Sequence, residues 1–210
     1  MRALCCCLYN IAYMTRQPRI DVADRYYHCI NRANARLKIN FQEKDFRLFI
    51  NVLSDAQEIF STNIVAYVVM NNHFHLVIKT KHDKELSKFM KWLTVVHTQR
   101  WHKDNGTIGT GHLYQGRFKS FPIKDQKHLE TVIRYVERNP LTAGFVDDVL
   151  DWRYSSLYQR YVTKTNNFNG NVAIGLSNWP CEDPIGYLEN LIKPLSNKEL
   201  AKSLEKEMEL

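Results

Sequence analysis

The sequence predicts an α+β fold: a ferredoxin-like βαββαβ antiparallel sheet with helices on one face, plus an extra helix after the last strand. Two observations predict it. Four short segments, rich in aromatic and β-branched residues, have the length and composition of strands. Three longer segments repeat their apolar residues with helical spacing, and two of these alternate with the strands in the order that this fold requires.

Strand, helix, strand and strand open the pattern. Residues 25–33 (RYYHCINRA) have the aromatic and β-branched content of a strand. Residues 43–60 place most of their apolar side chains on one helical face, which predicts an amphipathic helix. Residues 63–70 (NIVAYVVM) form a continuous apolar run of strand length. The asparagine pair that follows tolerates the positive φ of a two-residue turn, so residues 73–79 are the predicted returning strand of a hairpin.

A helix, a strand and a further helix complete the pattern. Residues 83–103 carry a broad apolar face, and a loop with three glycines ends this second predicted helix. Residues 113–123 (LYQGRFKSFPI) are the fourth predicted strand. Asp125 is a suitable N-cap for the third helix, which we expect to stop before Pro140, because the residue before a proline disfavours helical geometry. This extra helix carries Tyr135.

Length and composition predict one domain with an extension at each end. The chain has 210 residues, of which 44% are hydrophobic and 24% charged, and this balance is typical of a globular core. We expect the core domain at residues 25–160, an N-terminal extension at 1–24, and a C-terminal extension of unknown role at 161–210. Met14 is the preferred native start, and a targeting role for the short apolar stretch before it is the alternative.

Charge and cysteine content indicate the class of partner and the compartment. A formal net charge of +7 favours polyanions, with nucleic acid ahead of an acidic membrane surface. The apolar stretch at the N-terminus is too short to span a bilayer. The five cysteines show no CxxC spacing and no disulfide framework, and free thiols are typical of a reducing cytoplasm.

Two histidines, His73 and His75, interrupt the apolar stretch AYVVMNNHFHLVIKT. Because side chains alternate along a strand, both imidazoles share one face with Val77, and the large apolar side chains between them point to the other. Their backbones lie about 7 Å apart, a spacing that suits two ligands of one divalent ion. The alternative is a pair of solvent-facing histidines without a role. The apolar surroundings favour a metal site, which two histidines alone do not complete.

The third helix offers further candidates in RYVERNP. Tyr135 and Asn139 are four residues apart, so they lie on one helical face. An asparagine carbonyl can ligate a hard cation, and a tyrosine hydroxyl can attack phosphorus to form a covalent phosphotyrosine. Equally, the tyrosine could pack at the edge of the sheet while the asparagine merely ends the helix. The residues alone leave both interpretations open.

Basic side chains near these segments suit phosphate groups. Arg117 and Lys119 would point to the same side of the fourth strand, and Gly116 would allow close approach of the backbone. Arg32 and Arg36 lie just after the first strand. A solvated edge strand whose charges discourage aggregation is the alternative for the first pair.

Taken together, these segments resemble the single-tyrosine HUH transposases and, within them, the REP-associated tyrosine transposases. The resemblance covers about residues 25–160, in order, which would make this the catalytic domain. Its specific parts are the two histidines with the asparagine before them and the tyrosine four residues before Asn-Pro. The matching segments are YHCINRANARLKINF, AYVVMNNHFHLVI, GHLYQGRFKS, RYVERNPLTAGFV and DWRYSSLYQR.

The resemblance implies a metal-dependent single-stranded DNA endonuclease and strand transferase that cuts next to hairpins. It implies Mg²⁺ or Mn²⁺ held by His73, His75 and Asn139, with Tyr135 as the nucleophile that stays joined to the 5′ end. No nucleotide cofactor is implied. The implied partner is single-stranded DNA with REP-type hairpins, with no membrane partner. A monomer is favoured over a dimer, in the cytoplasm and associated with the nucleoid.

Some features depart from the family pattern, and other functions remain to be weighed. Ala33 stands where the family commonly has glycine, and the resemblance is loose beyond Tyr161. The alternative function is a non-catalytic regulatory protein that binds hairpin DNA, against which the intact set of four site residues argues. A cupin-like oxygenase is disfavoured, because the long helices at 43–60 and 83–103 do not belong to a double-stranded barrel.

Overall fold

The computed structural model describes residues 19–163, 167–168, 171–172, 174–177, 186–187 and 191. The expected native start at Met14 and most of the predicted C-terminal extension therefore lie outside the described residues. Within the part described, no helix is both long and apolar enough to span a membrane.

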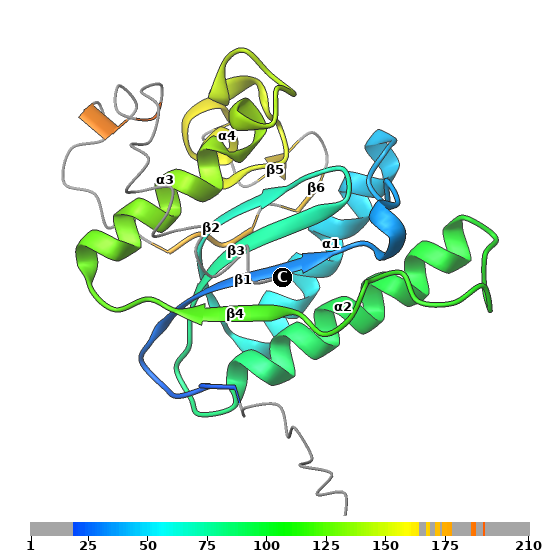
Figure 1. Cartoon of the computed structure of the whole chain (residues 1–210), viewed down its shortest axis with the longest axis horizontal. Coiled ribbons are helices and arrows are strands. Elements are labelled where there is room, and N and C mark those ends of the chain that lie inside the picture. The colour runs from blue at the N-terminus through cyan, green and yellow to red at the C-terminus, as the bar shows by residue number, and fades with distance from the viewer. Residues whose placement is uncertain are drawn as a thin grey trace, which may run out of the picture.

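The core of the fold is a four-stranded antiparallel sheet in the order β2-β3-β1-β4, with three long helices (Figure 1). This is the strand order of the predicted ferredoxin-like fold, and the elements follow one another along the chain as expected. The strands are β1 (Tyr26–Arg32), β2 (Asn63–Val69), β3 (His73–Lys79) and β4 (Lys119–Pro122). The long helices are α1 (Glu43–Phe60), α2 (Glu85–Asp104) and α3 (Gln126–Thr142).

Shorter elements connect and extend this core. A 3₁₀ turn, η1 (Asn34–Arg36), follows β1, and a second, η2 (Val149–Asp151), follows α3. One turn of helix, α4 (Ser156–Tyr158), continues into a π-helical turn, η3 (Gln159–Thr163). Two short strands, β5 (Asn167–Phe168) and β6 (Asn171–Val172), pair with each other.

The helix starts follow from local sequence. At the start of α1, Gln42 and Asp45 form a capping box, in which each side chain accepts a backbone N–H of the other residue. Asp125 caps α3 as predicted, because its side chain accepts the backbone N–H of His128. The asparagine pair at 71–72 joins β2 to β3, so the predicted hairpin is confirmed.

Two boundaries differ from the prediction. The fourth strand is only Lys119–Pro122, because before it the chain forms a single isolated bridge, between Tyr114 and Ala33, the residue after β1. Helix α3 does not stop before Pro140 but continues through it. A proline there removes one backbone hydrogen bond near the end of the helix, and the N–H groups of Ala143 and Phe145 still close the last turn.

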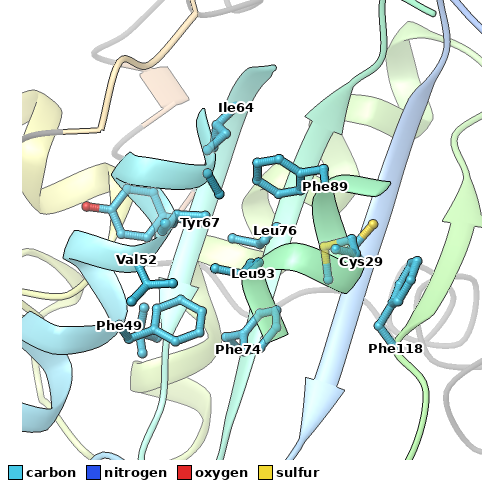
Figure 2. Close-up of a cluster of buried hydrophobic side chains, with 14 of the residues drawn as sticks. Cys29, Phe49, Val52, Ile64, Tyr67, Phe74, Leu76, Phe89, Leu93 and Phe118 are labelled. Carbon is cyan, nitrogen blue, oxygen red and sulfur yellow. The ribbon is translucent and has the colours of Figure 1, made fainter. Parts of the chain in front are cut away.

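The two faces of the sheet have different coverings. Helices α1 and α2 lie side by side against one face (Figure 1). Figure 2 shows how their apolar side chains meet those of the sheet, with Phe49 and Val52 from α1 and Phe89 from α2 directed toward Phe74 and Leu76 of β3. This is the largest apolar core, and it confirms that the two helices of the βαββαβ unit share one face.

Helix α3 packs on the second face, over β2 and β3. A smaller apolar cluster forms there, in which Val132 and Val136 of α3 meet Val68 and Val77 of the strands. The face that the topology leaves open is therefore partly covered by the extra helix. That helix brings its own side chains to the two histidines.

Candidate metal and nucleophile site

The site lies on the second face, between β3 and α3. His73 and His75 share this face with Val77, and Phe74 and Leu76 enter the core on the other side, so the predicted alternation is confirmed. The ring centroids of the two histidines are 5.0 Å apart. The predicted pair of neighbouring imidazoles is therefore present.

His75 is buried, with only 2% of its surface exposed. Its Nδ1 lies 3.0 Å from Nε2 of His28 on the neighbouring strand β1. Its Nε2 lies 3.4 Å from the side-chain nitrogen of Asn139 on α3. Both ring nitrogens thus have defined partners, and Nε2 is the one that faces the tyrosine helix.

His73 is half-buried and takes its partners from two sides. Its Nδ1 lies 2.7 Å from Oδ1 of the preceding Asn72. An amide oxygen can only accept, so Nδ1 carries the proton and the neutral ring keeps a lone pair on Nε2. The Asn139 side chain is also a hydrogen-bond partner of this histidine. Asn139 therefore stands between the two imidazoles.

Both histidines are held neutral. The pKa of His73 is lowered to about 4, mainly by burial and also by the positive charge of nearby Arg32. The hydrogen bond with Asn139 raises this pKa by a smaller amount. Burial also lowers the pKa of His75 well below its usual value, helped by His73, His28 and Arg32. A histidine binds a metal through a neutral ring, so the pair is in the ligand form at neutral pH.

Tyr135 packs on the same cluster from α3. Its ring centroid lies 5.6 Å from that of His75 and 6.0 Å from that of His28, and it meets both rings edge to face. The helical spacing of four residues places Asn139 one turn further along the same side. The fold thus brings together all four residues for which the sequence predicts a metal or nucleophile role.

Helix α3 is fixed in this position by a buried carboxyl group. Glu137 has no exposed surface, and its two oxygens accept hydrogen bonds from Ser156 Oγ at 2.7 Å and the Tyr187 hydroxyl at 2.9 Å. Ser156 Oγ also accepts the backbone N–H of Tyr67 in β2. Burial raises the pKa of Glu137 to about 7. These bonds tie the tyrosine helix to the sheet and to the C-terminal part of the chain.

The donor set is suitable for a divalent ion. The described residues contain no group of three or more His, Cys, Asp or Glu side chains arranged to hold a metal, and the amide of Asn139 is the polar side chain that contacts both imidazoles. Its oxygen and nitrogen exchange places on a half turn of the group, which would present the carbonyl to an ion. Two imidazoles and one amide oxygen leave positions for water and phosphate oxygens, as Mg²⁺ and Mn²⁺ require.

The predicted DNA-binding residues occupy different places. Arg32 is exposed and lies directly opposite His73 in the register of β1 on β3. Lys119 in β4 is on the same face, because it is directly opposite Ile30 of β1, which is itself directly opposite His75 of β3. Arg36 lies in η1, and its side chain is outside the part that the structure describes.

The prediction that Arg117 shares a strand face with Lys119 is wrong. Arg117 lies in a bend before the short β4, so strand alternation does not apply to it. It lines instead a groove of about 910 Å³ between α2 and residues 112–118, together with Arg19 and Lys91.

Sequence reasoning did not find His28. The residue lies in the first predicted strand, but nothing in that segment shows which face meets the histidines of β3. Only the register does so, because it pairs His28 with Val77 and places it diagonally beside His75.

Comparison with known proteins assigns the chain to a family. The sequence model of the family described as "Transposase IS200 like" matches residues 21–139, more than half of the chain. The chain belongs to this family. The matched region contains His73, His75, Tyr135 and Asn139, the four residues of the candidate site. Membership in the IS200-like transposases makes a DNA-processing role the expected one.

Individual relatives agree with this assignment. A curated protein of Haemophilus influenzae, named provisionally as a REP-associated tyrosine transposase, is 26% identical over an alignment of 103 residues, and the match covers 45% of this chain. The match spans only 58% of that relative's own length. A solved REP-associated tyrosine transposase bound to a REP hairpin has a TM-score of 0.60 and 17% identity, covering 82% of this chain and 99% of the other. At that identity the structural likeness shows the fold.

Proposed function

We propose that this IS200-like protein cuts and rejoins single-stranded DNA next to hairpins, with a divalent metal ion and a covalent phosphotyrosine intermediate. The observation that carries the proposal is the meeting of His73, His75, Asn139 and Tyr135 between β3 and α3. Two neutral imidazoles and an amide beside a phenol form a set with little use in a structural core. It matches the needs of phosphoryl transfer to tyrosine.

The ion would be Mg²⁺ or Mn²⁺, held by the Nε2 atoms of His73 and His75 and by the Asn139 carbonyl. When bound, it would polarise the scissile phosphate and stabilise the negative charge that develops in the transition state. The contacts that Nδ1 of His73 makes with Asn72 and Nδ1 of His75 makes with His28 keep the rings oriented. Arg32 and Lys119 lie on the same face, where they can bind the phosphates on either side.

Tyr135 would carry out the covalent step. Its phenol oxygen forms a bond to phosphorus while the bond from phosphorus to the 3′-oxygen breaks; the phenol loses its proton to water, and the released 3′-oxygen gains one. The 5′ end stays on Tyr135. A later attack by a 3′-hydroxyl on the phosphotyrosine reverses these changes and rejoins a strand. The ester retains the bond energy, so no nucleotide cofactor is needed.

The proposed substrate is single-stranded DNA that carries a REP-type hairpin. It is supported by the name of the Haemophilus influenzae relative, by the hairpin in the related solved structure, and by the net charge of +7. A polyanion is the expected partner of such a surface. We propose that the protein acts as a monomer, because the tyrosine and the histidine pair come from the same chain. We also propose that it acts near the nucleoid.

A gel assay tests the proposal. The protein is incubated with a panel of labelled single-stranded hairpin oligonucleotides and Mn²⁺, and a denaturing gel is examined for a protein–DNA adduct. Wild-type protein should form the adduct, and Tyr135→Phe should bind hairpins with nearly unchanged affinity but form none. If hairpins are bound without cleavage by either protein, the chain is a regulatory hairpin-binding protein instead.

A further inference from the structure

A third histidine is buried behind the proposed metal ligands. His28 lies in β1 with 4% of its surface exposed, and none of the proposed steps uses it. Its ring is stacked on that of His75, with centroids 5.2 Å apart and planes inclined by 17°. The ring of Tyr135 meets it edge to face at 6.0 Å. His28 therefore contacts both a proposed ligand and the proposed nucleophile.

The hydrogen bond between the two rings is directional. His28 Nε2 and His75 Nδ1 are 3.0 Å apart, so one nitrogen carries the proton and the other accepts it. If His75 donates from Nδ1, its lone pair is on Nε2, which faces Asn139 and the space between the histidines. If His75 accepts instead, Nε2 carries the proton and cannot bind a metal.

The surroundings favour the first arrangement. In the orientation that the structure gives the Asn139 amide, its nitrogen lies 3.4 Å from His75 Nε2. Because an amide nitrogen donates, Nε2 is the acceptor in that orientation. His73 already has the same pattern, with Nδ1 bonded to Asn72 and Nε2 left for an ion. In protein metal sites, the second nitrogen of a histidine ligand normally donates to a fixed partner that sets the tautomer.

We propose that His28 is a positioning residue, whose Nε2 accepts the Nδ1–H of His75 and so holds the lone pair of His75 Nε2 toward the metal site. This inference rests on the proposed function for the metal itself. The tautomer of His75 is a property of the metal-free protein and can be tested separately. This role differs from packing, because another planar ring without Nε2 would fill the space but could not accept the hydrogen bond from His75 Nδ1–H.

Two variants separate these roles. His28→Phe keeps a planar ring that can stack on His75 and contact Tyr135, but it has no acceptor. His28→Gln loses the ring but places its Oε1 the same number of bonds from Cβ as the histidine Nε2. A positioning role predicts that Gln supports metal binding and Phe does not, whereas a packing role predicts the reverse.

Mn²⁺ affinity, measured by electron paramagnetic resonance of the free ion, is the first readout. His28→Phe should bind Mn²⁺ about 10- to 100-fold more weakly than wild type, the usual effect of losing such a partner, and His28→Gln should bind within about threefold. The control is His97→Phe, which alters another buried histidine whose Nδ1 bonds to the Tyr114 hydroxyl in the opposite core. It should leave Mn²⁺ affinity unchanged even if it lowers the melting temperature.

Long-range ¹H–¹⁵N spectra of the metal-free protein give the second readout. Wild-type His75 should show protonated Nδ1 and unprotonated Nε2. The opposite tautomer would overturn the inference without touching the proposed function. Equal Mn²⁺ affinity in wild type and His28→Phe would also overturn it, as would equal losses in the Phe and Gln variants. Wild-type protein that binds no Mn²⁺ would overturn the proposed function, and the metal role of His28 with it.

Discussion

The buried histidines on the two faces of the central sheet have different neighbours. On the face covered by α1 and α2, His97 lies in a dense apolar cluster, where its Nδ1 bonds to the Tyr114 hydroxyl and its Nε2 has no hydrogen-bond partner. On the face covered by α3, His75 bonds through both nitrogens to polar side chains and packs against a tyrosine. Burial alone therefore does not mark a site; convergent polar partners do.

The neighbouring residues His75 and Leu76 offer the sharpest test of this contrast, because they point to opposite faces. His75→Ala should lower Mn²⁺-dependent cleavage by more than about 100-fold, since even a lost outer partner costs about 10- to 100-fold. Leu76→Ala leaves a cavity in the larger core and should lower the free energy of unfolding by about 2–5 kcal/mol. Cleavage per folded molecule should survive in the leucine variant. Activity assays below both melting temperatures, with denaturant titrations, measure the two effects.

Removing the metal should affect only the α3 face. EDTA should abolish formation of the protein–DNA adduct, and excess Mn²⁺ should restore it. Circular dichroism should show the same secondary structure in both conditions, because the larger core on the other face needs no ion. Adduct formation at full rate in EDTA would show that the two histidines serve another purpose.

His97, on the α1 and α2 face, should contribute to acid instability, as should His28, His73 and His75 on the α3 face, whose pKa values burial also lowers. Burial lowers the pKa of His97 to about 3 from its usual 6.5, so the unfolded chain binds a proton more readily than the folded one. The stability from this group is complete above about pH 6.5 and is lost as the pH falls toward 3, by at most about 1.4 kcal/mol per pH unit. Melting temperatures between pH 7 and pH 4.5 should fall less steeply for His97→Phe than for wild type. Parallel slopes would contradict the assignment.

Single basic residues on the α3 face should give the smallest effects. Arg32→Ala and Lys119→Ala should each weaken hairpin binding modestly and reduce the slope of log affinity against log salt by about one, the value for one lost phosphate contact. Arg100→Ala is the matched control, because Arg100 of α2 pairs with Asp55 of α1 on the other side of the sheet. Fluorescence anisotropy over a salt series measures all three. An equal change in slope for Arg100→Ala would contradict the expectation that the DNA contacts the α3 face rather than the α1 and α2 face.

The sequence predicted what depends on local periodicity. Strand alternation placed His73 and His75 on one face, and helical spacing placed Tyr135 beside Asn139; the structure confirms both placements. The asparagine pair located the hairpin, and Asp125 located the start of α3. These signals are carried by neighbouring residues, so no tertiary information was needed.

The remaining features depend on contacts between distant segments. His28 reaches His75 only through the register of β1 on β3, which one segment alone does not reveal. Arg117 is not on the expected strand face, because the chain pairs at Tyr114 with Ala33, just after β1, and pairs with β1 itself only from Lys119. Helix α3 continues through Pro140, which is buried near the end of the helix, and the backbone N–H groups of Ala143 and Phe145 still close its last turn. In the first two cases long-range strand pairing, rather than local preference, decides the position.

The central claim is that Tyr135 attacks a phosphate at the site between β3 and α3. Its most direct test is mass spectrometry of the trapped adduct after digestion with protease and nuclease. We predict a nucleotide 5′-phosphate on the peptide that contains Tyr135, formed only with Mn²⁺ or Mg²⁺. A nucleotide on any other residue, or abundant cleavage without a covalent adduct, would contradict it.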